Sequence, residues 1–135
     1  MPRFPSAAWV EGYVEKLNAS EAYRDAGRTW EGDILFVVQK DEGLAQDCYV
    51  YLDLYHGACR THGYAEGDSS ALPQPEFRYI GPYGNWVRLL KGEIDPIRGL
   101  MTGKFKLKGS MMKIMRYSRA AKEMVNATTA VDSTF

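Results

Sequence analysis

The sequence has little of what most catalytic or metal-binding sites require. Among its 135 residues are two histidines, His56 and His62, and two cysteines, Cys48 and Cys59. They lack the spacing of a zinc site, which needs at least three protein ligands, and no Gly-x-Ser-x-Gly motif indicates a nucleophile. We therefore predict no metal, no cofactor and no catalytic residue. The cysteines are interpreted as reduced thiols of a cytoplasmic protein, with a single disulfide as the alternative.

Long hydrophobic runs and an excess of charge of one sign are also lacking. The longest apolar run, residues 34–38, is far shorter than the roughly 20 residues that span a bilayer. The first residues do not resemble a signal peptide, which also favours the cytoplasm. Seventeen Lys and Arg balance seventeen Asp and Glu, so the net charge is zero. Because nucleic-acid binding relies on positive charge, we expect no nucleic-acid partner.

The charges are nevertheless distributed unevenly. Residues 88–122 contain ten basic and two acidic side chains, so this stretch carries +8 and the remainder −8. Lys104, Lys106 and Lys108 alternate with apolar residues, which puts the three lysines on one side of a strand. Two interpretations stay open: a solvated face, or a patch that transiently meets an anionic membrane surface or a phosphorylated ligand.

Capping and turn residues divide the chain into short elements. Ser6 and Ser20 are expected to cap two helices, the second ending at Gly27. The predicted elements that follow are a four-strand meander over residues 34–40, 48–56, 58–64 and 77–80, helices over 85–91 and 95–103, a strand over 104–108 and one last helix over 111–127. This order predicts an α+β fold in one domain, residues 1–135, with a five-stranded, mostly antiparallel sheet and helices on one face.

Several motifs occur in a fixed order between Trp86 and Met115. A helix ends at Lys91-Gly92, Asp95-Pro96 begins a short helix, Gly103-Lys-x-Lys-x-x-Gly109 follows, and a methionine-containing apolar helix comes next. In this pattern the chain resembles the lipid-binding domain of sterol carrier protein type 2. The amino half, with Leu17-Asn-x-Ser-x-x-Tyr23 and Trp30-x-Gly32, is similar to prokaryotic members of that family. The resemblance covers nearly the whole chain.

The resemblance implies that the sheet and helices enclose an apolar cavity. Such a cavity holds fatty acids, fatty acyl thioesters such as acyl-CoA, or sterol-like molecules. The function that the resemblance implies is non-enzymatic binding of a lipid and its transfer.

Alternation and helical spacing supply the residues expected to line this cavity. Val50, Leu52 and Leu54 share one face of their strand, and five of the six methionines lie between Met101 and Met124. Methionine adapts to ligands of different shape, so the helix over 111–127 is expected to be a movable cover. The predicted lipid-binding residues are Ile34, Phe36, Val50, Leu52, Leu54, Trp86, Leu89, Leu90, Leu100, Met101, Phe105, Leu107, Met111, Met112, Met115 and Met124.

Two other functions stay open at this point. A structural or oligomerisation module would keep the fold but have no cavity large enough for an acyl chain. A small enzyme would need a polar cluster inside the cavity, for which Tyr49, Tyr51, Asp53 and Tyr55 are the candidates. Cavity volume and the position of these four side chains discriminate between the three functions.

Overall fold

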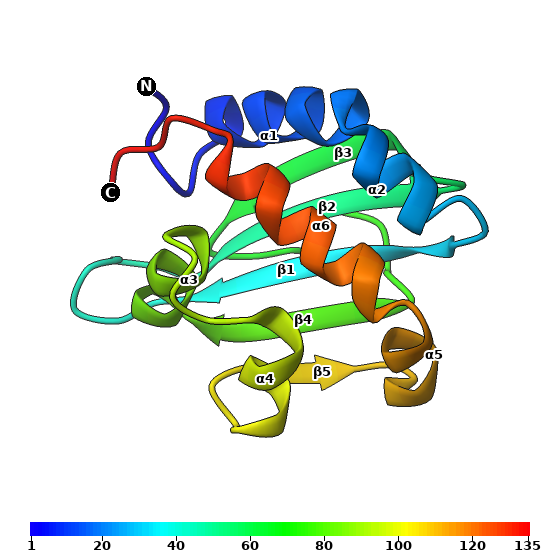
Figure 1. The fold of residues 1–135 in the computed structure, drawn as a ribbon. Helices are drawn as coiled ribbons and strands as arrows, with labels where there is room; N and C mark the ends of the chain where they lie inside the picture. The colour runs from blue at the N-terminus through cyan, green and yellow to red at the C-terminus, as the bar shows by residue number, and fades with distance from the viewer.

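A five-stranded sheet forms the centre of the computed structural model, which describes all of residues 1–135 (Figure 1). The strands are β1 (Glu31–Gln39), β2 (Cys48–Tyr55), β3 (Ala58–Glu66), β4 (Phe77–Pro82) and β5 (Lys106–Lys108). Their spatial order is β3-β2-β1-β4-β5, and all neighbours except β1 and β4 are antiparallel. The predicted α+β class with a mostly antiparallel sheet is confirmed.

The fourth strand does not continue the predicted meander, which is wrong at this point. β4 pairs parallel with β1, on the side opposite β2. A parallel neighbour needs a crossover connection instead of a hairpin, and residues 67–76 provide it. Leu72 of this connection packs on Leu35, Val37 and Tyr51, a small apolar cluster on the outer face of the sheet.

Six helices gather on the other side of the sheet (Figure 1). They are α1 (Ala7–Ala19), α2 (Glu21–Ala26), α3 (Tyr83–Leu90), α4 (Pro96–Met101), α5 (Met111–Arg116) and α6 (Ser118–Thr129). The predicted caps are confirmed: the side chains of Ser6, Ser20 and Asp95 accept hydrogen bonds from backbone N–H groups in the first turns of α1, α2 and α4.

The single last helix of the prediction is two helices. The chain bends at Tyr117, whose backbone (φ −112°, ψ 32°) is not helical. The ring of Tyr117 packs edge-on against Trp30 with the centroids 5.0 Å apart, and its hydroxyl lies 3.0 Å from Oγ1 of Thr29. These long-range contacts decide the direction of the chain, which the local sequence does not.

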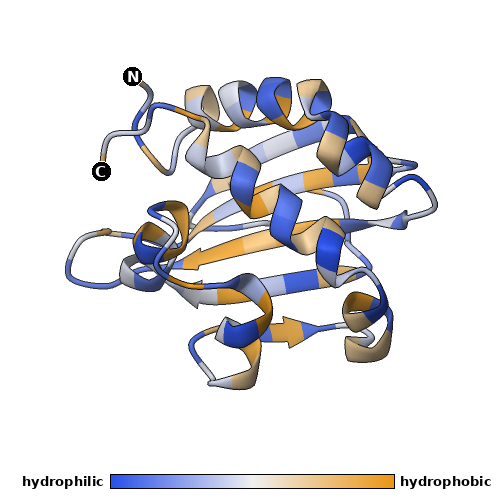
Figure 2. Cartoon of the chain, viewed as in Figure 1, coloured by the Kyte–Doolittle hydropathy of each residue, from blue (hydrophilic) through white to orange (hydrophobic).

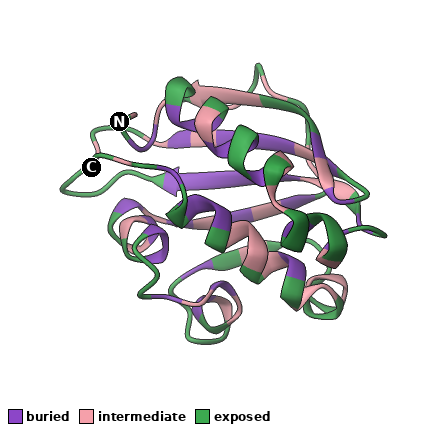
Figure 3. Ribbon diagram, turned by 45° about the horizontal axis from the view of Figure 1, so that its top comes forward, coloured by how far each residue is buried: buried purple, intermediate pink, exposed green.

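Alternation sorts the strand residues as predicted. The expected inward set, Ile34, Phe36, Val38, Val50, Leu52, Leu54 and Phe105, belongs to the main core, and Leu107 packs against that core. Figure 2 shows these apolar bands on the strands behind the helices, and Figure 3 shows that the central strands are mostly buried. Met101 was expected to face the sheet, but 75% of its surface is exposed. It ends the short helix α4 and points away from Pro96 and Gly99, the residues that α4 buries.

Phe105 attaches the β5 edge to the core, although it precedes the strand itself. A Cβ atom added to Gly81 would lie 2.5 Å from its ring, and one added to Gly99 would lie 2.8 Å from it. On its other sides the ring packs on Tyr79 and Trp86, with centroid distances of 4.8 and 5.2 Å. β4 and α4 can hold Phe105 between them because both carry glycine where they meet it.

We expect Gly81→Ala to lower the free energy of unfolding by about 1–3 kcal/mol, because the new methyl group overlaps the Phe105 ring. Urea denaturation measures the change. The control is Gly12→Ala in α1, where the nearest atom to the added carbon is 3.8 Å away and alanine favours the helix. Equal stability of Gly81→Ala and the unsubstituted protein would contradict the packing described.

Candidate functional site

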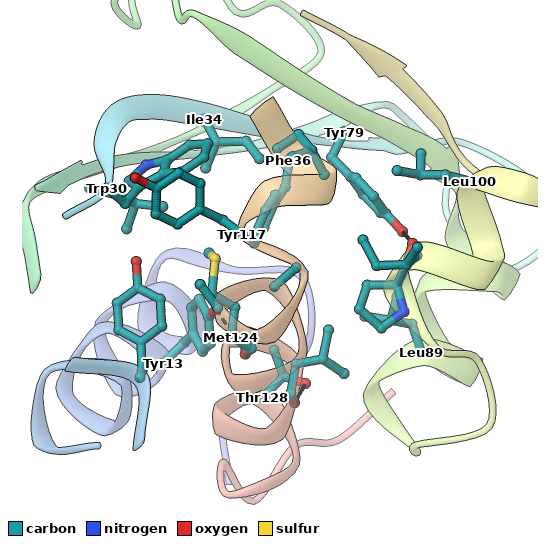
Figure 4. Close-up of a pocket in the computed structure, with 18 of the residues that line it drawn as sticks. Tyr13, Trp30, Ile34, Phe36, Tyr79, Leu89, Leu100, Tyr117, Met124 and Thr128 are labelled. Carbon is teal, nitrogen blue, oxygen red and sulfur yellow. Dashed lines mark hydrogen bonds between the residues drawn. The ribbon is translucent and has the colours of Figure 1, made fainter. Parts of the chain in front are cut away.

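An apolar pocket lies between the sheet and α6. Its volume is about 80 Å³, and nineteen residues from the sheet and from all six helices line it. Phe36 and Tyr79 extend from β1 and β4 on one side, and Met124 and Thr128 extend from α6 on the other (Figure 4).

The two sides of the pocket differ in kind. On the sheet side, aromatic rings pack on one another: the Trp86 ring lies 5.1 Å from Phe36 and 5.6 Å from Tyr79, centroid to centroid. On the α6 side, the lining includes two alanines, Ala120 and Ala121. α6 has only three buried residues in twelve, two of them alanines, although Met124 and Val125 of the same helix also line the pocket.

Seven of the predicted lipid-binding residues are brought together in the lining: Ile34, Phe36, Leu54, Trp86, Leu89, Leu100 and Met124. The prediction missed twelve others: Tyr13, Tyr23, Trp30, Tyr79, Pro96, Ile97, Ile114, Tyr117, Ala120, Ala121, Val125 and Thr128. The lining residues between 114 and 128 could have been found from the sequence, because residues 114, 117, 121, 124, 125 and 128 recur at helical spacing. A search for large apolar side chains alone overlooked the alanines and the threonine in that stripe.

The other predicted lining residues lie elsewhere. Val50, Leu52, Leu90 and Phe105 are buried in the core, Leu107 is half-buried against it, and Met101, Met111, Met112 and Met115 are exposed. The α5 methionines are displaced because Ile114 and Tyr117, three residues apart, occupy the inward side of that turn. The structure therefore gives the covering position to α6, and α5 lies beside the pocket.

Two of the tyrosine hydroxyl groups at the pocket are bonded to the protein. Tyr79 donates to the carbonyl oxygen of Pro96 at 2.7 Å, and Tyr13 donates to that of Met124 at 3.0 Å. Burial raises the pKa of Tyr13, Tyr23 and Tyr79 above the ordinary value of 10.0, so these phenols stay protonated. The pocket thus offers apolar surface and little polar chemistry.

The candidate enzymatic cluster is not in the pocket. Tyr51 lies on the outer face of the sheet and donates to Asp33 at 2.7 Å, while Asp53 accepts from Arg60 at 3.2 Å. None of the four side chains proposed for this cluster lines the cavity. No group of three or more His, Cys, Asp or Glu side chains is placed to hold a metal ion.

Both cysteines are free and buried. Burial raises the pKa of the Cys48 thiol above its ordinary value, and it raises that of Cys59 to about 11. A thiol that stays protonated is a poor nucleophile, so neither cysteine is suited to catalysis.

The basic stretch is partly neutralised. Lys113 pairs with Glu76 at 2.9 Å, and Arg119 pairs with Asp25 at 3.0 Å. Arg116 ends α5 and Arg119 lies on α6, so the bend at Tyr117 places these two arginines on different helices. The three alternating lysines before and in β5 are exposed and make no ion pair.

We expect Tyr79→Phe to lower the free energy of unfolding by about 0.5–1.5 kcal/mol, because the buried hydrogen bond from Tyr79 to the Pro96 carbonyl is lost. Chemical denaturation measures this loss. The matched control is Tyr49→Phe, since the Tyr49 hydroxyl on the outer face makes no hydrogen bond within the protein. If both variants unfold at the same denaturant concentration, the bond does not hold α4 to the sheet.

Comparison with known proteins gives a consistent result. The model of the SCP-2 sterol transfer family matches residues 13–122. A crystal structure of sterol carrier protein 2 has 36% identity and a TM-score of 0.85, with 93% of this chain and 97% of that chain covered. The solution structure of a conserved hypothetical protein from Thermus thermophilus also has 36% identity and a TM-score of 0.85, with 96% and 90% covered.

More distant structures share the fold. The apo form of sterol carrier protein 2 from Yarrowia lipolytica has 18% identity and a TM-score of 0.60, with 95% of this chain and 94% of that chain covered. Among curated proteins there is no matching sequence. None of the six helices has the length and apolar character needed to cross a membrane.

Proposed function

The chain belongs to the SCP-2 sterol transfer family, and from this premise we propose that it binds a lipid with a single acyl chain or a sterol-like body, without catalysing a reaction, and transfers it. The observation that carries the proposal is the apolar pocket between the sheet and α6, in which seventeen of the nineteen lining residues are hydrophobic. Burial of each CH₂ group contributes about 0.8 kcal/mol, so such a pocket binds a chain without specific polar contacts. The two free cysteines fit a reducing compartment, and we propose the cytoplasm.

Lipid binding requires the pocket to expand. Its volume of about 80 Å³ is below the roughly 300–1,000 Å³ of pockets that hold drug-sized ligands. α6 is the element best able to move, because it covers the pocket with small side chains and few of its residues are buried. We propose that the apolar pocket is contracted in this structure. When a ligand enters, α6 moves away from the aromatic side chains on the sheet side of the pocket.

The small volume also supports a second candidate function. A structural or oligomerisation module with this fold would keep the pocket contracted and would bind no lipid. The two functions predict opposite results for an acyl-chain probe, because only the first requires α6 to separate from the sheet.

We expect the purified protein to bind a fluorescent fatty acid with a saturable increase in emission. Ala121→Leu should weaken that binding about tenfold or more, because three added carbons fill the space beneath α6, while the melting temperature stays equal or rises. The control is Ala45→Leu in the exposed β1–β2 connection. Native mass spectrometry after lipid extraction provides an independent readout. Absence of saturable binding by the unsubstituted protein would favour the structural module.

The edge of the molecule around β5 is suited to a membrane surface. Four of the seven large hydrophobic residues that are exposed, Met101, Met111, Met112 and Met115, lie on α4 and α5, which flank β5 (Figure 1). The exposed lysines Lys104, Lys106 and Lys108 lie between them. We name these seven residues the methionine–lysine edge, and we propose that it docks transiently on anionic lipid, since cations attract headgroups and methionines enter the interface.

We expect the protein to co-sediment with vesicles that contain an anionic lipid at low salt and to be released at about 1 M salt, where the Debye length falls to about 3 Å. The double variant Lys106→Ser/Lys108→Ser should lose the binding at low salt. The control is Lys16→Ser, which removes an exposed lysine from α1. Equal recovery with neutral and anionic vesicles would leave the lysines as solvated residues only.

A further inference from the structure

A second hollow lies beside the apolar pocket, between α6 and the segment that joins α3 to α4. Its volume is about 250 Å³, and most of its eight lining residues are polar or glycine. α4 and α6 lie next to each other in Figure 1, and this hollow opens at the end of α4 that begins with Asp95-Pro96. We call it the polar groove.

The polar groove and the apolar pocket meet. Pro96 of α4 and Val125 of α6 line both, so these two side chains stand between the apolar interior and the polar exterior. An amphiphile placed along this line would have its chain among the aromatic rings and its head in the polar groove. The juxtaposition indicates both an orientation for the ligand and a route of entry between α4 and α6.

The charged residues that line the polar groove indicate which kind of lipid head group it can bind. Asp95 and Lys122 are the only charged residues in its lining. The carboxylate of Asp95 already accepts from the backbone N–H groups of Ile97 and Arg98 at 3.0 and 2.9 Å. Lys122 is exposed and makes no ion pair. The lining of the polar groove therefore holds one lysine and one carboxylate that form no ion pair with each other, and the carboxylate is held by two backbone N–H groups.

The other lysine near the apolar pocket is not available in this way. Lys113 lies 4.7 Å from the ring centroid of Trp30, a pocket residue. Its ammonium group donates to the carboxylate of Glu76 at 2.9 Å and to the carbonyl of Glu31 at 2.6 Å. An anionic head group near Lys113 would have to displace the carboxylate of Glu76. Lys122 has no ion-pair partner that would have to be displaced.

We propose that the polar groove binds the anionic head group of a single-chain lipid, with Lys122 as its counter-ion and the chain in the apolar pocket. This assignment rests on the proposed lipid binding and adds to it the charge, orientation and entry side of the ligand. A carboxylate and a phosphate share the required chemistry, because each accepts charge-assisted hydrogen bonds from an ammonium group.

Calorimetric titration with three twelve-carbon probes tests the assignment: dodecanoate, dodecyl phosphate and dodecanol. The chains are equal, so the pocket contributes equally to all three and only the heads differ. We expect Lys122→Met to weaken binding of one or both anions about three- to tenfold, in the range of a partly exposed ion pair, while the affinity for dodecanol is unchanged. Lys122→Arg should retain the anion affinity, and a loss confined to one anion identifies the head as carboxylate or phosphate.

The control is Lys16→Met, which removes an equal charge from the exposed side of α1 and should leave all three affinities unchanged. If Lys122→Met binds both anions as tightly as the unsubstituted protein, or if Lys16→Met weakens them equally, the head-group assignment is wrong while lipid binding stands. If the unsubstituted protein binds none of the three probes, the proposed function itself fails. Circular dichroism and thermal denaturation establish that the exposed substitutions leave the fold intact.

Discussion

Aromatic packing around Trp86 is the interaction on which the rest of the structure depends. The indole N–H donates to the carbonyl oxygen of Val37 at 3.0 Å, which ties α3 to the central strand β1. Phe36, Tyr79 and Phe105 pack around the same ring at 5.1 to 5.6 Å. This cluster joins β1, β4, α3 and the start of β5 into one rigid wall, because rings of this size have few alternative rotamers in a packed interior.

The pocket exists because the opposite side is built differently. α6 places alanines against the rings and is tied down by a few polar contacts, among them Tyr13 to the Met124 carbonyl and Arg119 to Asp25. Small side chains fill less space, so a cavity remains between the aromatic cluster around Trp86 and α6. Elements with few buried apolar contacts open at lower free energy than the core. The same arrangement therefore provides the apolar surface for a chain and the part that can move to admit it.

Function and fold are connected by the position of the polar parts. The polar groove lies beyond Pro96 and Val125, and the exposed methionines and lysines lie on the neighbouring β5 edge. The outer face of the sheet is covered in another way, because the β3–β4 connection places Leu72 directly on it.

Local features of the fold were predictable from the sequence. Ser6, Ser20 and Asp95 act within three residues of their partners, so capping depends on the local sequence alone. Alternation in β2 and the helical stripes also identified most of the core. About half of the predicted cavity residues were misplaced, because hydrophobicity shows that a side chain is buried but does not distinguish a pocket lining from a filled core.

The sequence by itself determined the class of fold, the caps, the inward faces of the strands and, through its ordered motifs, the family. Only the tertiary structure decided that β4 runs parallel beside β1, that the chain bends at Tyr117, and that α6, the second part of the predicted last helix, covers the pocket. These outcomes depend on contacts between residues far apart in the chain, such as Tyr117 with Trp30 and Phe105 with Gly81. Local propensity carries no information about such contacts, and the space left between packed elements exists only once all of them are in place.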